Sequence, residues 1–240
     1  MKCRFLFHRE STHNEQEEES YKKFIRKGKI YHPEDARKYK QIVRRLKSLP
    51  SSGKKLCEVG PRDGHFLTIC MESGFSVKAV EPSPAMANLL AEKGIPVVND
   101  HYEKSQYKQE EFDFIVMLQV LEHIPLPVEN ALAIAWFHLK KGGHIIIEVP
   151  SVSQPLYLLD RLKHSERRFS QLFIQDHCNY FSPQTITLAT SRAGFRKTSL
   201  ITGRWQEKYT GLKRLAGFIF DPILNLLRIG GILYIGQKID

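Results

Sequence analysis

Hydrophobic and polar positions alternate along the chain in blocks whose period changes. Apolar residues recur at helical spacing from Pro33 to Leu46, and proline suits the first turn of a helix. From Lys55 onward, short apolar runs of strand length alternate with helical stretches. The predicted strands cover residues 55–59, 77–80, 96–99, 112–120, 144–149, 195–203 and 231–237. The predicted helices between them cover 65–74, 85–93, 128–139 and 183–193.

This alternation predicts a parallel sheet built from right-handed crossovers, with helices on both of its faces. The near-continuous apolar run at 112–120 suits a strand that is buried on both sides. We therefore expect an α/β fold: a Rossmann-like, doubly wound, seven-stranded, mostly parallel sheet with an antiparallel last strand. Ligands of such sheets bind beyond the carboxyl ends of the strands.

The pattern also suggests how the chain divides. We expect residues 1–50 to form an N-terminal helical cap, in which the polar residues 1–20 are a loose lead-in with little to bury. Residues 51–240 form the main domain, and 151–182 is an insertion over the active site. An apolar stripe at 211–229 is expected to pack on the sheet, although peripheral membrane contact is an alternative.

Composition narrows the class of protein. The 240 residues are 42% hydrophobic and 26% charged, which is typical of a globular domain. Apolar runs are far shorter than a membrane span needs, and the N-terminus lacks the apolar core of a secretory signal, so we expect a cytoplasmic protein. Its four cysteines lie far apart, which argues against a disulfide framework or a zinc cluster.

Charge is unevenly distributed. The net charge is +10, and residues 21–55 carry 13 lysines and arginines against 2 acidic residues. A basic arm of this kind steers an anionic substrate, a nucleic acid or an anionic lipid surface. The alternative is a set of solvated helix faces without a partner.

Two features at the ends of predicted strands carry the first chemistry. Gly60 and Gly64 lie in the turn EVGPRDGHF, where glycine lets the backbone approach a ligand closely. Glu81 ends the second predicted strand, and an acid about 20 residues after a glycine-rich turn can accept hydrogen bonds from ribose hydroxyls.

Four motifs in order, EVGPRDGHF, VEPSPAM, FDFIVMLQVLEHIP and LKKGGHIIIEVPS, resemble the class I S-adenosylmethionine-dependent methyltransferases. The likeness extends over about residues 55–200 and is to the branch of ubiquinone-biosynthesis-like and sugar-modifying enzymes. It implies that S-adenosyl-L-methionine is the cofactor. The residues implied to bind it are Glu58, Gly60, Gly64, Phe66, Glu81, Pro82, Met86, Asp100 and Gln119.

The sequence departs from this family pattern at Arg62, which stands where the pattern has its middle glycine. If the backbone there has a positive φ, the side chain either crowds the cofactor or points outward.

Candidate catalytic residues come from two places. His123 follows the fourth predicted strand, and the segment QDHCNYFSP resembles a stretch of the same family branch in which an acid–histidine pair can remove a proton from the substrate. The candidates are therefore His123, Asp176, His177 and Tyr180. We expect no metal site, because the ten histidines show no short ligand spacing beyond Glu122-His123 and Asp176-His177.

These observations predict a methyltransferase acting on oxygen or carbon of a small-molecule acceptor. RNA methylation, suggested by the basic arm, is one alternative. A non-catalytic partner or membrane-associated module, suggested by Arg62 and the 211–229 stripe, is another. On the fold alone a nicotinamide dehydrogenase is conceivable, and the oligomeric state is left open.

Overall fold

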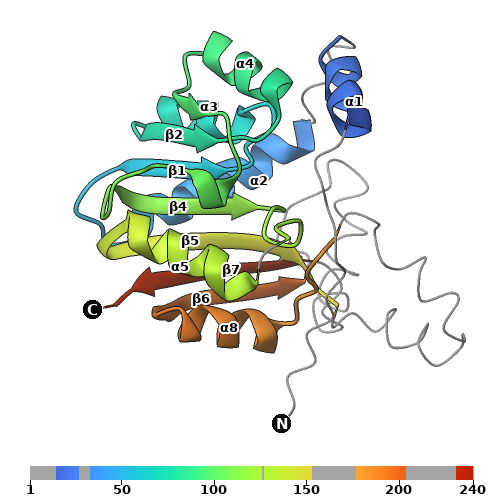
Figure 1. Ribbon diagram of the computed structural model, residues 1–240. Helices are drawn as coiled ribbons and strands as arrows, with labels where there is room; N and C mark the ends of the chain where they lie inside the picture. Colours follow the sequence, from blue (N-terminus) through green and yellow to red (C-terminus); the bar gives the residue numbers. More distant parts are fainter. Residues whose placement is uncertain (1–14, 27–32, 126, 153–176, 204–230, 240) are drawn as a thin grey trace, which may run out of the picture.

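A seven-stranded sheet with the order β3-β2-β1-β4-β5-β7-β6 runs through the computed structural model (Figure 1). The structure describes residues 15–26, 33–125, 127–152, 177–203 and 231–239. Strand β7 is antiparallel to both of its neighbours, and the other strand pairs are parallel. The strands are β1 (Lys55–Val59), β2 (Ser76–Val80), β3 (Val97–Val98), β4 (Phe112–Leu118), β5 (Leu139–Pro150), β6 (Phe195–Gly203) and β7 (Gly231–Lys238). The expected Rossmann-like fold is confirmed.

Helices cover both faces of this sheet. The described helices are α1 (Glu15–Arg26), α2 (Pro33–Ser48), α3 (His65–Glu72), α4 (Pro84–Glu92), the 3₁₀ turn η1 (Tyr102–Lys104), α5 (Val128–His138) and α8 (Pro183–Arg192). Helix α1 packs against α4. One buried cluster joins α5 and α8 to the sheet, and a second joins α2 and α3 to the opposite face. The central strands β1, β4 and β5 contribute to both clusters, because their alternate residues point to opposite faces.

The strand order reverses between β1 and β4, and this reversal creates the crevice at the carboxyl edge of the sheet. To one side of β1 lie β2 and β3, and to the other side lie β4, β5, β7 and β6. The loops that follow β1, β2 and β4 therefore converge on one edge.

Two local expectations were wrong. Residues 15–20 are not a loose lead-in, because they form the first half of α1. A tertiary contact accounts for this: the carboxylate of Glu18 accepts hydrogen bonds from the Ser83 hydroxyl (2.6 Å) and the Ala85 amide (3.0 Å), at the start of α4. Strand β5 begins at Leu139, where a helix end was expected, because Leu139 pairs with Phe112 across a bulge.

Other segments lie outside the described residues, including most of the expected insertion at 151–182 and the apolar stripe at 211–229. Within the described part of the chain, no helix is both long enough and apolar enough to cross a membrane.

Candidate active site

The turn after β1 is held in a conformation that glycine favours. Gly60 and Gly64 have φ angles of 65° and 71°, in the left-handed region. A Cβ on Gly60 would lie 2.8 Å from Val120 Cγ2, and one on Gly64 would collide with Leu90. The glycine backbone thus packs closely against the end of β4 and against α4, and it leaves α3 to begin without a side-chain cap.

Arg62 also has a positive φ, 50°, as the family pattern of a glycine at this position would require. Arg62 is exposed, so its side chain extends outward from the turn. A left-handed conformation costs a non-glycine residue roughly 1 kcal/mol. The Arg62 amide points inward and donates a hydrogen bond to Glu81 Oε2 at 3.3 Å.

Glu81 lies at the end of β2 with its carboxylate fixed by backbone amides. Besides the Arg62 amide, the Ser83 amide donates to Glu81 Oε1 at 3.0 Å. The Asn99 side chain, after β3, donates to the Glu81 carbonyl at 2.8 Å. Glu81 is only 4% exposed, so this acid is held in one orientation at the edge where β1, β2 and β3 end.

Glu58 lies beneath the same turn and is 3% exposed. Burial is the main cause that raises the pKa of its carboxyl well above the usual range. The negative charge of Asp63 raises this pKa further, and the positive charge of Lys38 partly offsets it. Burial of Glu58 therefore favours the protonated form of its carboxyl over the ionised form.

The remaining predicted cofactor residues have varied environments. Phe66 is buried in the core and packs edge to face on Tyr39 of α2, with ring centroids 5.5 Å apart. Met86 is fully buried at the start of α4, and Asp100 lies half-buried after β3. Pro82 is half-buried beside Glu81.

Gln119 is exposed at the carboxyl end of β4, with a φ of 58°. The backbone amide of Gln119 donates a hydrogen bond to the Glu148 carbonyl of β5 at 2.8 Å. Positive φ at a non-glycine residue where a strand ends is a strain that clusters at ligand sites.

The loop after β4 meets the segment before α8. Amides of Cys178 and Asn179 both donate to the Glu122 carbonyl, at 2.7 and 3.0 Å. The Asn179 side chain donates to the Ile124 carbonyl at 2.9 Å. These bonds clamp two segments that are far apart in sequence onto each other at the edge of the sheet.

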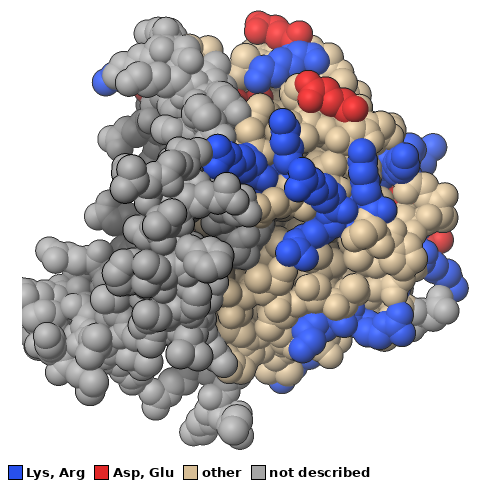
Figure 2. All heavy atoms as spheres, turned by 180° about the vertical axis from the view of Figure 1, so that it is seen from behind, with Lys and Arg blue, Asp and Glu red and all other residues tan. Residues whose placement is uncertain are grey.

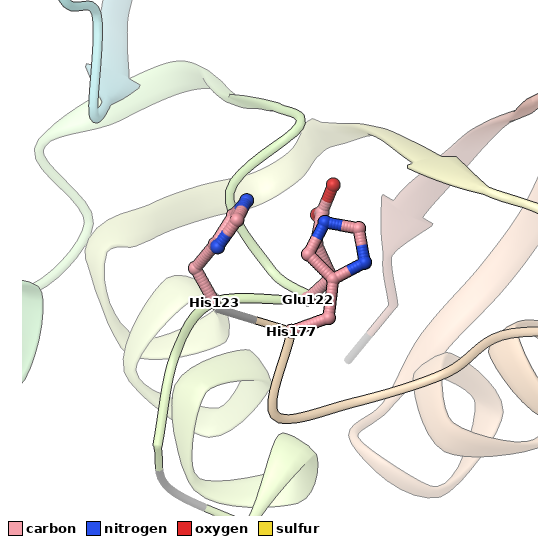
Figure 3. Close-up of side chains that lie close together, drawn as sticks. All are labelled: Glu122, His123 and His177. Atoms are coloured by element: carbon pink, nitrogen blue, oxygen red, sulfur yellow. The ribbon is translucent and has the colours of Figure 1, made fainter. Parts of the chain in front are cut away.

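The clamp brings two predicted catalytic histidines together. The rings of His123 and His177 lie edge to face (Figure 3), with centroids 4.6 Å apart. The ring of Tyr180 has its centroid 6.0 Å from that of His177. Glu122 joins them, with its side chain extending to the same side of the loops (Figure 3). Asp176, the predicted partner of His177, lies outside the described residues.

Glu122 is 1% exposed, and burial raises the pKa of its carboxyl to about 8. The nearby charge of Glu148 raises this pKa as well, and Lys38 lowers it. Glu122 is not among the site residues predicted from the sequence, because its grouping with His177 depends on the fold.

Lys38 of α2 is a second residue that sequence reasoning missed. Its ammonium pairs with Glu148 Oε2 at 2.5 Å, and both side chains are largely buried. The sequence signal is indirect: Glu148 lies within the apolar run 145–149, and a buried carboxylate needs a cation nearby. The positive charge of Lys38 lowers the pKa of Glu58, beneath the glycine turn, and that of Glu122, beside the two histidines.

Basic side chains gather on the back of the molecule (Figure 2). Exposed basic residues of α2 are Arg37, Lys40, Arg44, Arg45 and Lys47. A shallow groove between the C-terminal halves of α2 and α3 is lined by Lys40, Arg44 and Lys47. Because both helices run back toward the amino ends of the strands, this basic groove lies away from the carboxyl edge.

Comparisons with known proteins agree with this geometry. The chain matches the family described as "Methyltransferase domain" over residues 31–200. An uncharacterized protein of Methanocaldococcus jannaschii is 29% identical over 162 residues, which are 66% of this chain and 72% of that protein.

Solved structures share the fold. A Thermotoga maritima S-adenosylmethionine-dependent methyltransferase, described as a possible histamine N-methyltransferase, superposes with a TM-score of 0.61 at 20% identity, covering 91% of this chain and 98% of that one. Phosphoethanolamine N-methyltransferase 2 of Haemonchus contortus, in complex with S-adenosyl-L-methionine, superposes with a TM-score of 0.62 at 13% identity. The match covers 83% of this chain and 52% of that one.

The family match spans well over half of the chain, and the glycine turn and Glu81 lie where a doubly wound fold binds its ligand. The dehydrogenase and the non-catalytic module are thereby set aside. The chain belongs to the methyltransferase-domain family and is an enzyme, an S-adenosylmethionine-dependent methyltransferase.

Proposed function

We propose that this enzyme methylates oxygen or carbon of a small-molecule acceptor, and that it belongs to the ubiquinone-biosynthesis-like and sugar-modifying branch. The observation that carries the acceptor chemistry is the pairing of His123 with His177 at the carboxyl edge, ring centroids 4.6 Å apart. Oxygen and carbon acids must lose a proton to become nucleophiles, and imidazole is suited to accept it near neutral pH.

For cofactor binding, we assign the glycine turn to the methionine part and Glu81 to the ribose hydroxyls. Two observations support the fit. Side chains at Gly60 and Gly64 would collide with Val120 and Leu90, so the backbone itself forms the surface of the turn. The Glu81 carboxylate is fixed by two amides, so it loses little further freedom on accepting hydroxyl hydrogen bonds.

The cofactor supplies an activated methyl group on a sulfonium, which an aligned nucleophile displaces. The protein's contribution is then to position the acceptor and to receive its proton. We assign proton removal to His123 or His177. Tyr180 lies near His177 in the structure, and Asp176, which precedes His177 in the sequence, is a further candidate.

RNA methylation is the second candidate, and the exposed basic face of α2 is the observation in its favour. The groove on that face lies between the C-terminal halves of α2 and α3. It is therefore remote from the strand ends to which we assign methyl transfer, which favours the small-molecule acceptor.

Two measurements test the proposal. Calorimetric titration with S-adenosylhomocysteine, with NAD as a negative control, should give micromolar binding that Glu81→Ala weakens by about 100-fold. Glu92→Ala, an exposed acid at the end of α4, is the matched control and should bind like the parent.

For the acceptor, the enzyme is incubated with methyl-labelled cofactor and either a protein-free small-molecule extract or purified RNA. We expect label in the small-molecule fraction and its loss in His177→Ala. Label confined to nuclease-sensitive RNA, with binding that weakens steeply as salt rises, would instead establish the RNA candidate.

A further inference from the structure

Glu122, His123 and His177 form a compact cluster of metal-ligating side chains, here called the Glu-His-His cluster (Figure 3). One ligand atom from each residue lies within 4.8 Å of the other two. Two of these residues come from the loop after β4, and the third comes from the segment before α8. The cluster therefore exists only where these segments are clamped together.

The Glu122 carboxylate is the decisive member. It is 1% exposed, and within the described part of the chain neither of its oxygens accepts a hydrogen bond from another residue. A buried polar group without partners is costly, and a carboxylate in this position is best satisfied by a cation. The nearby ammonium of Lys38 is already engaged with Glu148 at 2.5 Å.

Hydrogen bonds hold the loop after β4 against the segment before α8. Two backbone amides, those of Cys178 and Asn179, fix the Glu122 carbonyl, and the Asn179 side chain fixes the Ile124 carbonyl. These bonds orient the backbone on both sides of the cluster. Hydrogen bonds of this kind hold in position the loop that carries two of the proposed ligands.

We propose that Glu122, His123 and His177 bind a divalent transition-metal ion of the Zn²⁺ type. Two imidazoles and one carboxylate are the ligand set of catalytic zinc sites, whereas Mg²⁺ and Ca²⁺ prefer oxygen alone. Bonds of about 2.0–2.1 Å put tetrahedral ligand atoms roughly 3.3 Å apart, so small side-chain rotations close the cluster. His123 is the most exposed member, so a further ligand can approach the cluster from its side.

The site itself does not depend on the acceptor proposed above, but its purpose does rest on that proposed function. An ion held here would supply Lewis-acid chemistry: it would lower the pKa of an acceptor hydroxyl, whose proton would pass to solvent water. His123 and His177 would then act as metal ligands in the loaded enzyme, and as candidate bases only in the metal-free enzyme.

The test uses the full chain, stripped of metal with a chelator and titrated with Co²⁺ while its visible absorption is recorded. We expect the intense bands of a four- or five-coordinate ion, abolished by stoichiometric Zn²⁺. His177→Ala, His123→Ala and Glu122→Gln should each weaken binding by about 100-fold or more. His101→Ala, a histidine outside the cluster, is the matched control and should bind like the parent.

X-ray absorption of the Zn²⁺-loaded parent protein needs no variant to fold. A shell with two imidazoles supports the site, and a shell without imidazole overturns it. Absence of Co²⁺ bands, or bands unchanged in all three cluster variants, also overturns it. Because S-adenosylhomocysteine binding is measured separately, a failed metal titration leaves the proposed function standing, and a failed cofactor titration leaves the metal site standing.

Discussion

Two neighbouring parts of the carboxyl edge are stabilised in different ways. In the turn after β1, the backbone is central: Gly60 and Gly64 have positive φ, and amides fix Glu81. In the Glu-His-His cluster, side chains from distant segments meet, and the buried carboxylate has no hydrogen-bond partner among the described residues. The first region is therefore held mainly by backbone conformation and backbone amides, whereas the second depends on side chains that long-range contacts bring together.

Lys38 links the two regions, and its removal should have the largest effect. Lys38→Met leaves the buried Glu148 without its ion pair and removes the cation that lowers the pKa values of Glu58 and Glu122. Breaking a buried pair by removing one partner costs about 3–5 kcal/mol of unfolding free energy. Urea unfolding measures this. Lys40→Met, on the exposed side of the same helix, should stay within about 0.5 kcal/mol of the parent.

Next in size, Gly64→Ala tests the steric requirement of the backbone-held region. The new methyl group would meet a backbone φ of 71° and collide with Leu90, so we expect a loss of about 3 kcal/mol. Gly94→Ala has a similar φ, 74°, but no atom within 4 Å of the new Cβ, and should cost only about 1 kcal/mol. Equal losses in the two variants would mean that close packing at Gly64 is unimportant.

Asn179→Ala loosens the clamp of the second region. It removes the side-chain bond to the Ile124 carbonyl, which is buried with its partner, and should cost about 2 kcal/mol in thermal or urea unfolding. Affinity for Co²⁺ should fall about 10-fold, while S-adenosylhomocysteine binding stays unchanged. A larger effect on cofactor binding than on metal binding would contradict the division into two regions.

A smaller effect concerns pH. Burial raises the folded pKa of Glu58, so between the usual carboxyl pKa and this raised value the folded state keeps a proton that the unfolded state has lost. Stability therefore falls as pH rises through this window. Glu58→Gln cannot titrate, so its stability should fall less than that of the parent as the pH rises from 5 to 8. Parallel stability profiles would show that Glu58 ionises normally.

Arg62→Gly should have the smallest effect and the opposite sign. Glycine relieves roughly 1 kcal/mol of left-handed strain at a φ of 50°, and its greater freedom in the unfolded chain offsets part of the gain. We expect a net stabilisation of about 0.5 kcal/mol, visible as a slightly raised Tm. A lowered Tm would show that contacts of the Arg62 side chain outweigh the strain.

Local sequence patterns were enough to predict most elements. An apolar run forms β4, and a serine and a proline start α8. These signals act within a few residues, so they can be recognised in the sequence. Helix α1, which includes residues 15–20, could not be predicted from the sequence. Its Glu18 carboxylate accepts hydrogen bonds from Ser83 and Ala85, which lie far along the chain. The start of β5 was misplaced for a similar reason, since pairing of Leu139 with Phe112 ends the helix before it.

The sheet, the glycine turn and the acid at the end of β2 could be predicted from residues close together in the chain, because backbone φ and strand periodicity are local properties. The pairing of Lys38 with Glu148 and the meeting of Glu122 and His123 with His177 arise from folding. Those contacts join segments separated by many residues, and burial sets their energies. Burial and distance between remote segments are properties of the folded chain, which no spacing of residues records.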